Sequence, residues 1–223
     1  MKIFSFNTLA AKNIALKLIA LAALTGFAVI GYADEAADIQ TLQTRWAEIK
    51  YQTPEADQEK AFVALVAQAE QLRTANTQAP YLIWEAIIRS TYAGAKGGLG
   101  ALDQVKQAKK LLEQAIKLDP AALNGSAYTS LGSLYYQVPG WPVGFGDDKK
   151  AKEMLEKGLS YNPDGIDSNY FYGDYLLEQK NYQQALIAFE KALKAAPRPG
   201  RESADAGRKG EIESAMAKAK KHL

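Results

Sequence analysis

The chain has 223 residues, of which 27 are Lys or Arg and 25 are Asp or Glu, so that its formal net charge is +2. It contains no cysteine and a single histidine, His222, next to the C-terminal residue. These counts exclude disulfides, thiol chemistry, nucleophile pairs that need a histidine, and metal sites ligated by several histidines.

Residues 1–33 are predicted to form a secretory signal peptide. Three lysines precede an apolar run over residues 18–30, and small residues follow it up to Ala33. This order is typical of an export signal, and the run is shorter than the roughly 20 residues that cross a bilayer. We expect cleavage near Ala33 and a periplasmic mature chain with no stable membrane span. Anchoring by an uncleaved N-terminal segment is the alternative.

The mature chain predicted in this way is close to neutral. Removing residues 1–33 takes away three of the 27 basic residues and none of the 25 acidic ones, which leaves a formal net charge of −1. A near-neutral chain offers no basic surface of the kind that binds nucleic acid. The remaining length suits one domain with a hydrophobic core.

Residues 34–80 are predicted to form a degenerate pair of helices, 35–51 and 54–75. The stretch "LVAQAEQLRTA" aligns with "LLEQAIKLDPA" further along the chain. It has Phe62 where the later copy has alanine, and it lacks the proline that closes that copy. Terminal units of repeat arrays are usually atypical, because one of their sides faces water.

Residues 81–200 are predicted to form three helical hairpins, of which 166–197 is the clearest. Apolar and small residues recur there at helical spacing in two runs, with Asn181 in the turn between them. A second-helix pattern of small, large, small and proline occurs three times, as Ala108, Leu112, Ala115 and Pro120, as Ala151, Leu155, Gly158 and Pro163, and as Ala185, Phe189, Ala192 and Pro197. The closing prolines are 43 and 34 residues apart.

These patterns resemble the tetratricopeptide repeat, which has a period of 34 residues. The stretches "SLGSLYY" and "YGDYL" carry the pattern of its first helix, and "IWEAII" carries a weaker form. The resemblance implies an all-α fold, a right-handed superhelical solenoid of antiparallel helix pairs. Residues 201–223, polar and rich in lysine near their end, are expected to form a C-terminal capping helix.

A narrower resemblance lies in the C-terminal half. The stretches "PGWPVGFGDDKKA" and "NPDGIDSNYFYGDYL" are similar to exported bacterial tetratricopeptide proteins that include the T component of TRAP transporter systems. This resemblance implies a protein that binds a solute or hands it to a periplasmic binding protein. Many members of that family carry a lipid-anchoring cysteine, which this chain lacks.

Two of the three hairpins contain extra residues between their helices. The first-helix Gly173 and second-helix Ala185 are 12 residues apart, whereas the corresponding separations upstream are 19 and 20 residues. We expect both insertions to form loops on one edge of the solenoid, which is often the binding edge. Trp141 and Phe145, in the later insertion, either pack on that edge or await a partner. We favour a self-packed loop that also forms a binding rim.

The first helices of the hairpins are expected to line a concave groove. The positions that the repeat pattern leaves free there are Glu85, Arg89, Tyr92, Thr129, Ser133, Tyr136, Tyr170 and Asp174. Tyrosines, hydroxyls and a few charges are typical of a recognition surface or a small-ligand cavity. The alternative is that these are solvated helix positions without a binding role.

The sequence therefore favours a non-enzymatic periplasmic adaptor that binds a protein or peptide, with no cofactor and no metal. Carboxylate pairs such as Asp147 and Asp148 are explained by helix capping, so they are not expected to be catalytic. The alternative from another class is a small-solute-binding accessory protein of a transport system. A chaperone or assembly factor for envelope complexes would use the same surface as the adaptor.

Overall fold

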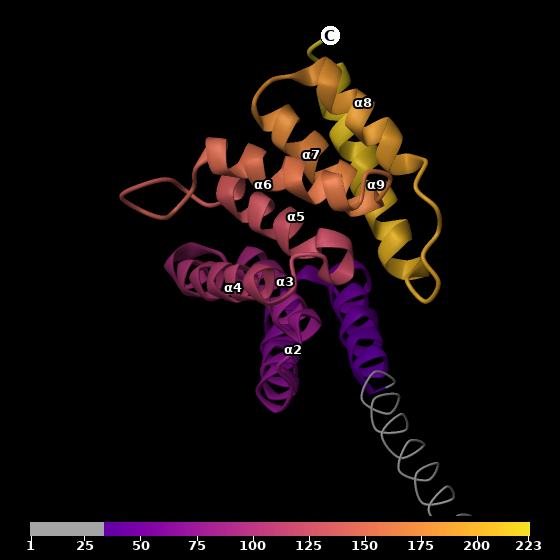
Figure 1. Cartoon of the computed structure of the whole chain (residues 1–223). Helices are drawn as coiled ribbons and strands as arrows, with labels where there is room; N and C mark the ends of the chain where they lie inside the picture. Colours follow the sequence, from indigo (N-terminus) through magenta and orange to yellow (C-terminus); the bar gives the residue numbers. More distant parts are fainter. Residues whose placement is uncertain (1–33) are drawn as a thin grey trace, which may run out of the picture. The chain divides into compact units, whose positions relative to one another are not determined.

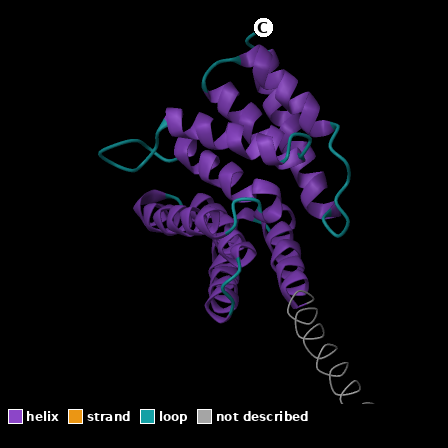
Figure 2. Ribbon diagram, viewed as in Figure 1, coloured by secondary structure: helices purple, strands orange, loops and turns teal. Residues whose placement is uncertain are grey.

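The computed structural model describes residues 34–223. The predicted signal peptide, residues 1–33, lies outside the described residues. Residues 40–223 form one compact unit, and the residues up to Ile39 belong to another, of which residues 34–39 are helical. The regular elements of residues 34–223 are helices (Figure 2). None of these helices is both long and apolar enough to cross a membrane.

The compact unit begins with helical residues 40–52, the N-terminal helix, which continue the helical run from residue 34. The helices that follow are α2 (Glu55–Ala75), α3 (Ala79–Lys96), α4 (Gly98–Leu118), α5 (Ala122–Gln137), α6 (Asp148–Tyr161), α7 (Ile166–Glu178), α8 (Tyr182–Leu193) and α9 (Glu202–Lys220). Helix α3 packs on α4, α5 on α6, and α7 on α8, so that successive helices form hairpins (Figure 1). The fold is an all-α solenoid of helix pairs, as predicted.

Small residues let the helices of a hairpin approach closely. A Cβ atom added to Gly132 would lie 2.7 Å from the Cγ atom of Leu155, and one added to Gly173 would lie 2.7 Å from the Cδ1 atom of Phe189. Any larger residue at either glycine would therefore push the second helix of its hairpin away. Both glycines are therefore needed for the close approach of the two helices.

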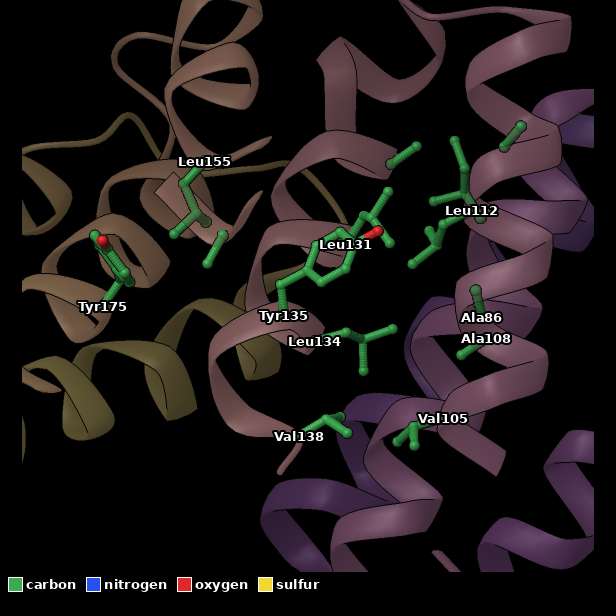
Figure 3. Close-up of a cluster of buried hydrophobic side chains, with 14 of the residues drawn as sticks. Ala86, Val105, Ala108, Leu112, Leu131, Leu134, Tyr135, Val138, Leu155 and Tyr175 are labelled. Carbon is green, nitrogen blue, oxygen red and sulfur yellow. The ribbon is translucent and has the colours of Figure 1, made fainter. Parts of the chain in front are cut away.

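The core runs through the hairpins without a break. The small and large residues of the repeat pattern have at most 1% of their surface exposed, namely Ala108, Leu112, Ala115, Ala151, Leu155, Ala185, Phe189 and Ala192. Leu131, Leu134 and Tyr135 of α5 lie between Leu112 of α4 and Leu155 of α6 (Figure 3). Burial of such side chains stabilises the fold by roughly 25 cal/mol per Å² of apolar surface.

The two insertions have different structures. Residues 138–147 form a loop that extends away from the helices between α5 and α6 (Figure 1). Asp147 ends this loop and caps α6, since its side chain accepts a hydrogen bond from the Lys150 backbone N–H (3.0 Å), which confirms the predicted cap. The earlier insertion does not form the loop that we expected. Gly97 and Gly98, with φ values of 64° and 60°, turn the chain directly from α3 into α4, and the extra residues lengthen these two helices.

Helix α9 joins the two ends of the compact unit. It packs on α7 and α8, and the segment from Gly200 onward also contacts the N-terminal helix. Gln40 donates a hydrogen bond to the Gly200 carbonyl oxygen (2.7 Å), Gln52 donates one to the Ser203 hydroxyl (2.7 Å), and the Tyr51 hydroxyl donates one to Glu211 (3.2 Å). The residues predicted as a capping helix thus also connect the last hairpin to the N-terminal helix.

Candidate partner-binding cleft

A cleft of about 760 Å³ lies on the concave side, lined mainly by α3, α5, α7, the N-terminal helix and residues 198–211. Its aromatic residues are Trp46, Trp84, Tyr170 and Phe171, its hydroxyl-bearing residues include Thr91, Ser126, Thr129, Ser130, Ser133 and Ser168, and its charged residues are Lys50, Glu55, Asp167, Arg198, Arg201, Arg208 and Glu211. The lining therefore combines apolar surface with many hydrogen-bonding groups.

Helix α3 forms one wall through residues spaced three and four apart. Trp84, Ile87 and Thr91 lie on the same face of this helix and all line the cleft. The Trp46 indole N–H donates a hydrogen bond to the Thr91 hydroxyl (2.9 Å), which ties the N-terminal helix to this wall. Trp84 itself is only 4% exposed.

The chain enters α5 through a left-handed turn at the edge of the cleft. Leu123, Asn124 and Gly125 have φ values of 49°, 55° and 70°. A Cβ atom on Gly125 would lie 2.6 Å from the Cβ atom of Tyr161, so glycine is needed there for space as well as for its φ. Leu123 and Asn124 both line the cleft, and residues in this region of φ and ψ concentrate at functional sites.

A second part of the lining is a wall of charged side chains centred on Asp167 of α7. Its carboxylate accepts hydrogen bonds from Arg198 Nη1 (2.6 Å) and Arg208 Nε (2.8 Å). Burial alone would raise the pKa of the Asp167 carboxyl, but the two arginines outweigh burial and hold that pKa well below its usual range. Asp167 is therefore ionised at neutral pH and fixes both guanidinium groups.

The other carboxylates of this wall are also paired. Arg208 donates to Glu211 (2.5 Å), and its guanidinium carbon lies 4.3 Å from the centre of the Tyr170 ring. Asp205 accepts a hydrogen bond from Arg198 Nε (2.7 Å), and Lys50 lies 3.5 Å from Glu211. Arg201 differs from its neighbours, because its guanidinium carbon lies 5.2 Å from the centre of the Trp84 ring and not beside a carboxylate.

The predicted groove residues divide into two groups. Thr129, Ser133 and Tyr170 line the cleft, whereas Glu85, Arg89, Tyr92, Tyr136 and Asp174 do not. For the second group the predicted position was wrong.

Glu85, Arg89 and Tyr92 lie on the face of α3 that is packed against its neighbours, and each is at most 6% exposed. Arg89 donates to Glu85 (2.7 Å), to Glu70 of α2 (3.0 Å) and to Gln104 of α4 (2.9 Å). These polar side chains satisfy one another inside the fold, and α3 presents Trp84 and Ile87 to the cleft in their place.

Tyr136 and Asp174 pair with each other away from the cleft. The Tyr136 hydroxyl donates to the Asp174 carboxylate (2.7 Å) and so joins α5 to α7. Burial, assisted by Asp174, raises the pKa of Tyr136 well above its usual value. The pair therefore holds two hairpins together through a hydrogen bond from a neutral tyrosine.

The rim prediction for Trp141 and Phe145 is also wrong in part. Neither residue lines the cleft. Phe145 packs edge-on against Tyr135 with ring centres 5.9 Å apart, as expected of a self-packed loop. Trp141 is 90% exposed, because the loop carries it away from the helices and no neighbour covers it.

The sequence interpretation missed the arginines of the cleft. Three of the chain's six arginines, Arg198, Arg201 and Arg208, fall within eleven residues of a tail that otherwise uses lysine. Arginine is favoured over lysine for paired, partly buried sites. The three arginines so close together in the sequence could therefore have indicated a charged site in this segment. Within residues 34–223, no group of three or more His, Asp or Glu side chains is placed to hold a metal ion.

Comparison with known protein families agrees with this architecture. Models of the tetratricopeptide repeat match residues 144–198, which contain α6, α7 and α8, and residues 99–121, which contain most of α4. No curated protein matches the chain. Repeats of this type are typically non-catalytic modules and point to interaction with other proteins. The chain therefore contains tetratricopeptide repeats over residues 99–121 and 144–198, within an all-α solenoid fold.

Proposed function

We propose that this protein is a non-enzymatic periplasmic adaptor that holds a segment of a partner protein in the cleft. The observation that carries the proposal is the cleft itself, whose walls come from the first helix of each hairpin and from residues 198–211. Its mixture of aromatic, hydroxyl and charged side chains is the composition of a recognition surface. A segment in the cleft would contact all three hairpins at once.

A small-solute carrier is the competing function. The cleft volume of about 760 Å³ falls within the range of small-molecule sites, about 300–1,000 Å³, so size does not separate the two functions. Native mass spectrometry of the gently purified protein separates them. The adaptor predicts a bare chain or a chain that travels with a polypeptide, and a discrete small-molecule adduct would favour the carrier.

Site-specific photo-cross-linking in cells tests the adaptor directly. A photoreactive amino acid replaces Ser130, which lines the cleft, and the matched control carries it at Ser214, which is exposed on α9 outside the cleft. We expect one protein to be cross-linked from position 130 and not from position 214. The same product from both positions, or no protein product from position 130, contradicts the proposal.

The periplasmic location requires its own test, since it depends on residues 1–33. Intact mass measurement of the protein from a cell envelope fraction should give a chain that begins near residue 34. A full-length chain would contradict cleavage and support the uncleaved anchor. Recovery in the cytoplasmic fraction would contradict export itself.

A further inference from the structure

Arg201 is the arginine of the cleft that makes no direct ion pair. Within residues 34–223, its side chain makes no ion pair, whereas Arg198 and Arg208 each bind two carboxylates. Burial and the neighbouring Arg198 lower the pKa of the Arg201 guanidinium, against the opposing effect of Asp167 and Asp205, and arginine remains charged at neutral pH. Arg201 therefore brings to the cleft a positive charge that no carboxylate of the described residues contacts directly.

Two buried hydrogen-bond donors at this point also lack acceptors. In the described part of the chain, Nε of Arg201 and Nε1 of Trp84 are buried side-chain nitrogens without a hydrogen-bond partner. An unsatisfied buried donor costs about 1–3 kcal/mol, so native proteins rarely leave one unpaired. Arg201 comes from the residue before α9 and Trp84 from α3, yet both line the same cleft.

The nearby carboxylates of the protein are engaged elsewhere. Asp167 and Asp205 are held by Arg198, and Glu211 by Arg208. None of them lies within ion-pair distance of Arg201, and Asp167 and Asp205 act on its charge only from further away. An acceptor for Arg201 and Trp84 can be supplied by the occupant of the cleft.

We propose that Arg201 and Trp84 together bind a carboxylate of the segment that occupies the cleft. This inference rests on the proposed function, in which the occupant is a protein, because the anionic groups of an unmodified protein are carboxylates. A guanidinium binds a carboxylate through two parallel N–H bonds, and the indole N–H adds a third donor. The apolar face of Trp84 beneath Arg201 keeps water from competing for the charge.

The carboxylate comes either from an acidic side chain or from the C-terminus of the partner, and peptides separate these sources. The probes are three blocked alanine- and serine-based pentapeptides that carry one central glutamate with an amidated end, one free C-terminus with a central glutamine, or neither. Inorganic phosphate is the fourth probe. The readout is the indole N–H resonance of Trp84 in the ¹⁵N-labelled protein, assigned with the Trp84→Phe variant.

At least one carboxylate peptide should shift the Trp84 signal with millimolar affinity, and the neutral peptide should not. Arg201→Gln should weaken that binding by at least about tenfold, the loss expected for a charge-assisted hydrogen bond. The control Lys209→Gln, an exposed charge on α9, should leave it within about twofold. The peptide that binds identifies the source of the carboxylate.

The inference is overturned if the neutral peptide shifts the signal equally, if Arg201→Gln binds as the wild type does, if only phosphate binds, or if no probe binds. None of these results changes the cross-link expected from position 130, so they contradict the inference without contradicting the proposed adaptor function. Loss of that cross-link with carboxylate binding intact would instead contradict the adaptor and leave the anion site in place.

Discussion

Two networks of charged side chains lie in this solenoid, and they differ in whether every arginine is paired. The first joins α2 to α3, where Arg73 and Arg89 share Glu85 and Glu70. The second joins α7 to α9 across the cleft wall, where Asp167, Asp205 and Glu211 satisfy Arg198 and Arg208 but not Arg201. Every arginine of the first network has a direct ion pair, and Arg201 of the second network has none.

Charge pairing distinguishes the structural role of the first network from the binding role proposed for the second. Glu85 and Arg89 are almost completely buried. Removing one partner of a buried ion pair is costly, because the other partner keeps its charge without a counter-charge or water around it. Arg201 is half-buried in a cleft and already lacks a partner, so the fold depends little on it. Substitutions in the two networks should therefore affect stability and binding in opposite ways.

The largest effect is expected in the first network. Glu85→Gln removes the charge that Arg73 and Arg89 share and should lower the free energy of unfolding by about 3 kcal/mol. Urea unfolding at neutral pH measures this loss. Glu156→Gln, in an exposed pair with Lys152, is the control and should cost less than about 0.5 kcal/mol. Equal losses in the two variants would show that the buried network contributes no more than a surface pair.

The second network depends on the contact of α9 with the N-terminal helix, which a pair of glycines tests. A Cβ atom at Gly207 would overlap the Tyr51 ring, whereas one at Gly210 would meet nothing within 4 Å. Gly207→Ala should therefore destabilise the protein by about 1–3 kcal/mol through overpacking. Gly210→Ala should stabilise it by about 0.5–1 kcal/mol, since alanine favours the helix interior. Stabilisation by both substitutions would mean that the ends of the unit do not pack closely.

The pH dependence of stability should report on Asp167. A carboxyl whose pKa is lower in the folded chain than in the unfolded one contributes stability above its unfolded pKa of about 4, and this contribution fades as the pH falls below that value. Because about a third of the side chain is exposed, solvent screening limits the effect to about 1 kcal/mol.

Unfolding free energies of the wild type and of Asp167→Asn at pH 5 and pH 3 measure this dependence. The wild type should lose about 1 kcal/mol more than the variant over this interval, because the variant has no carboxyl to protonate at this position. Parallel losses in the two proteins would show that the arginines do not hold the Asp167 carboxylate in its charged form.

The hairpins were predictable from the sequence because their spacing is local. Each close approach needs a small residue at a fixed distance from a large one, as with Gly173 and Phe189, and the pattern repeats three times. The rotation of α3 was not predictable in the same way. The charges of Glu85 and Arg89 suggested an exposed face, but opposite charges four residues apart can compensate each other and be buried.

The cleft wall was harder to predict, because its residues come from distant parts of the chain. Tyr51 and Glu211, which connect the N-terminal helix to α9, are 160 residues apart. Their contact depends on the summed curvature of all the intervening hairpins, which no single motif specifies. Trp84 was assigned only to the first-helix repeat pattern, which gave no sign of the buried donor that it brings to the cleft.

The smallest effect on stability is expected at Arg201, where the effect on binding should be largest. Arg201→Gln removes a half-buried charge that has no partner, so the free energy of unfolding should change by less than about 1 kcal/mol or should rise. Arg198→Gln, which breaks ties to Asp167 and Asp205, should cost more. Urea unfolding of the two variants measures the difference. A loss at Arg201 as large as that at Arg198 would mean that the fold itself satisfies the Arg201 charge, and the distinction between the first and the second network would then disappear.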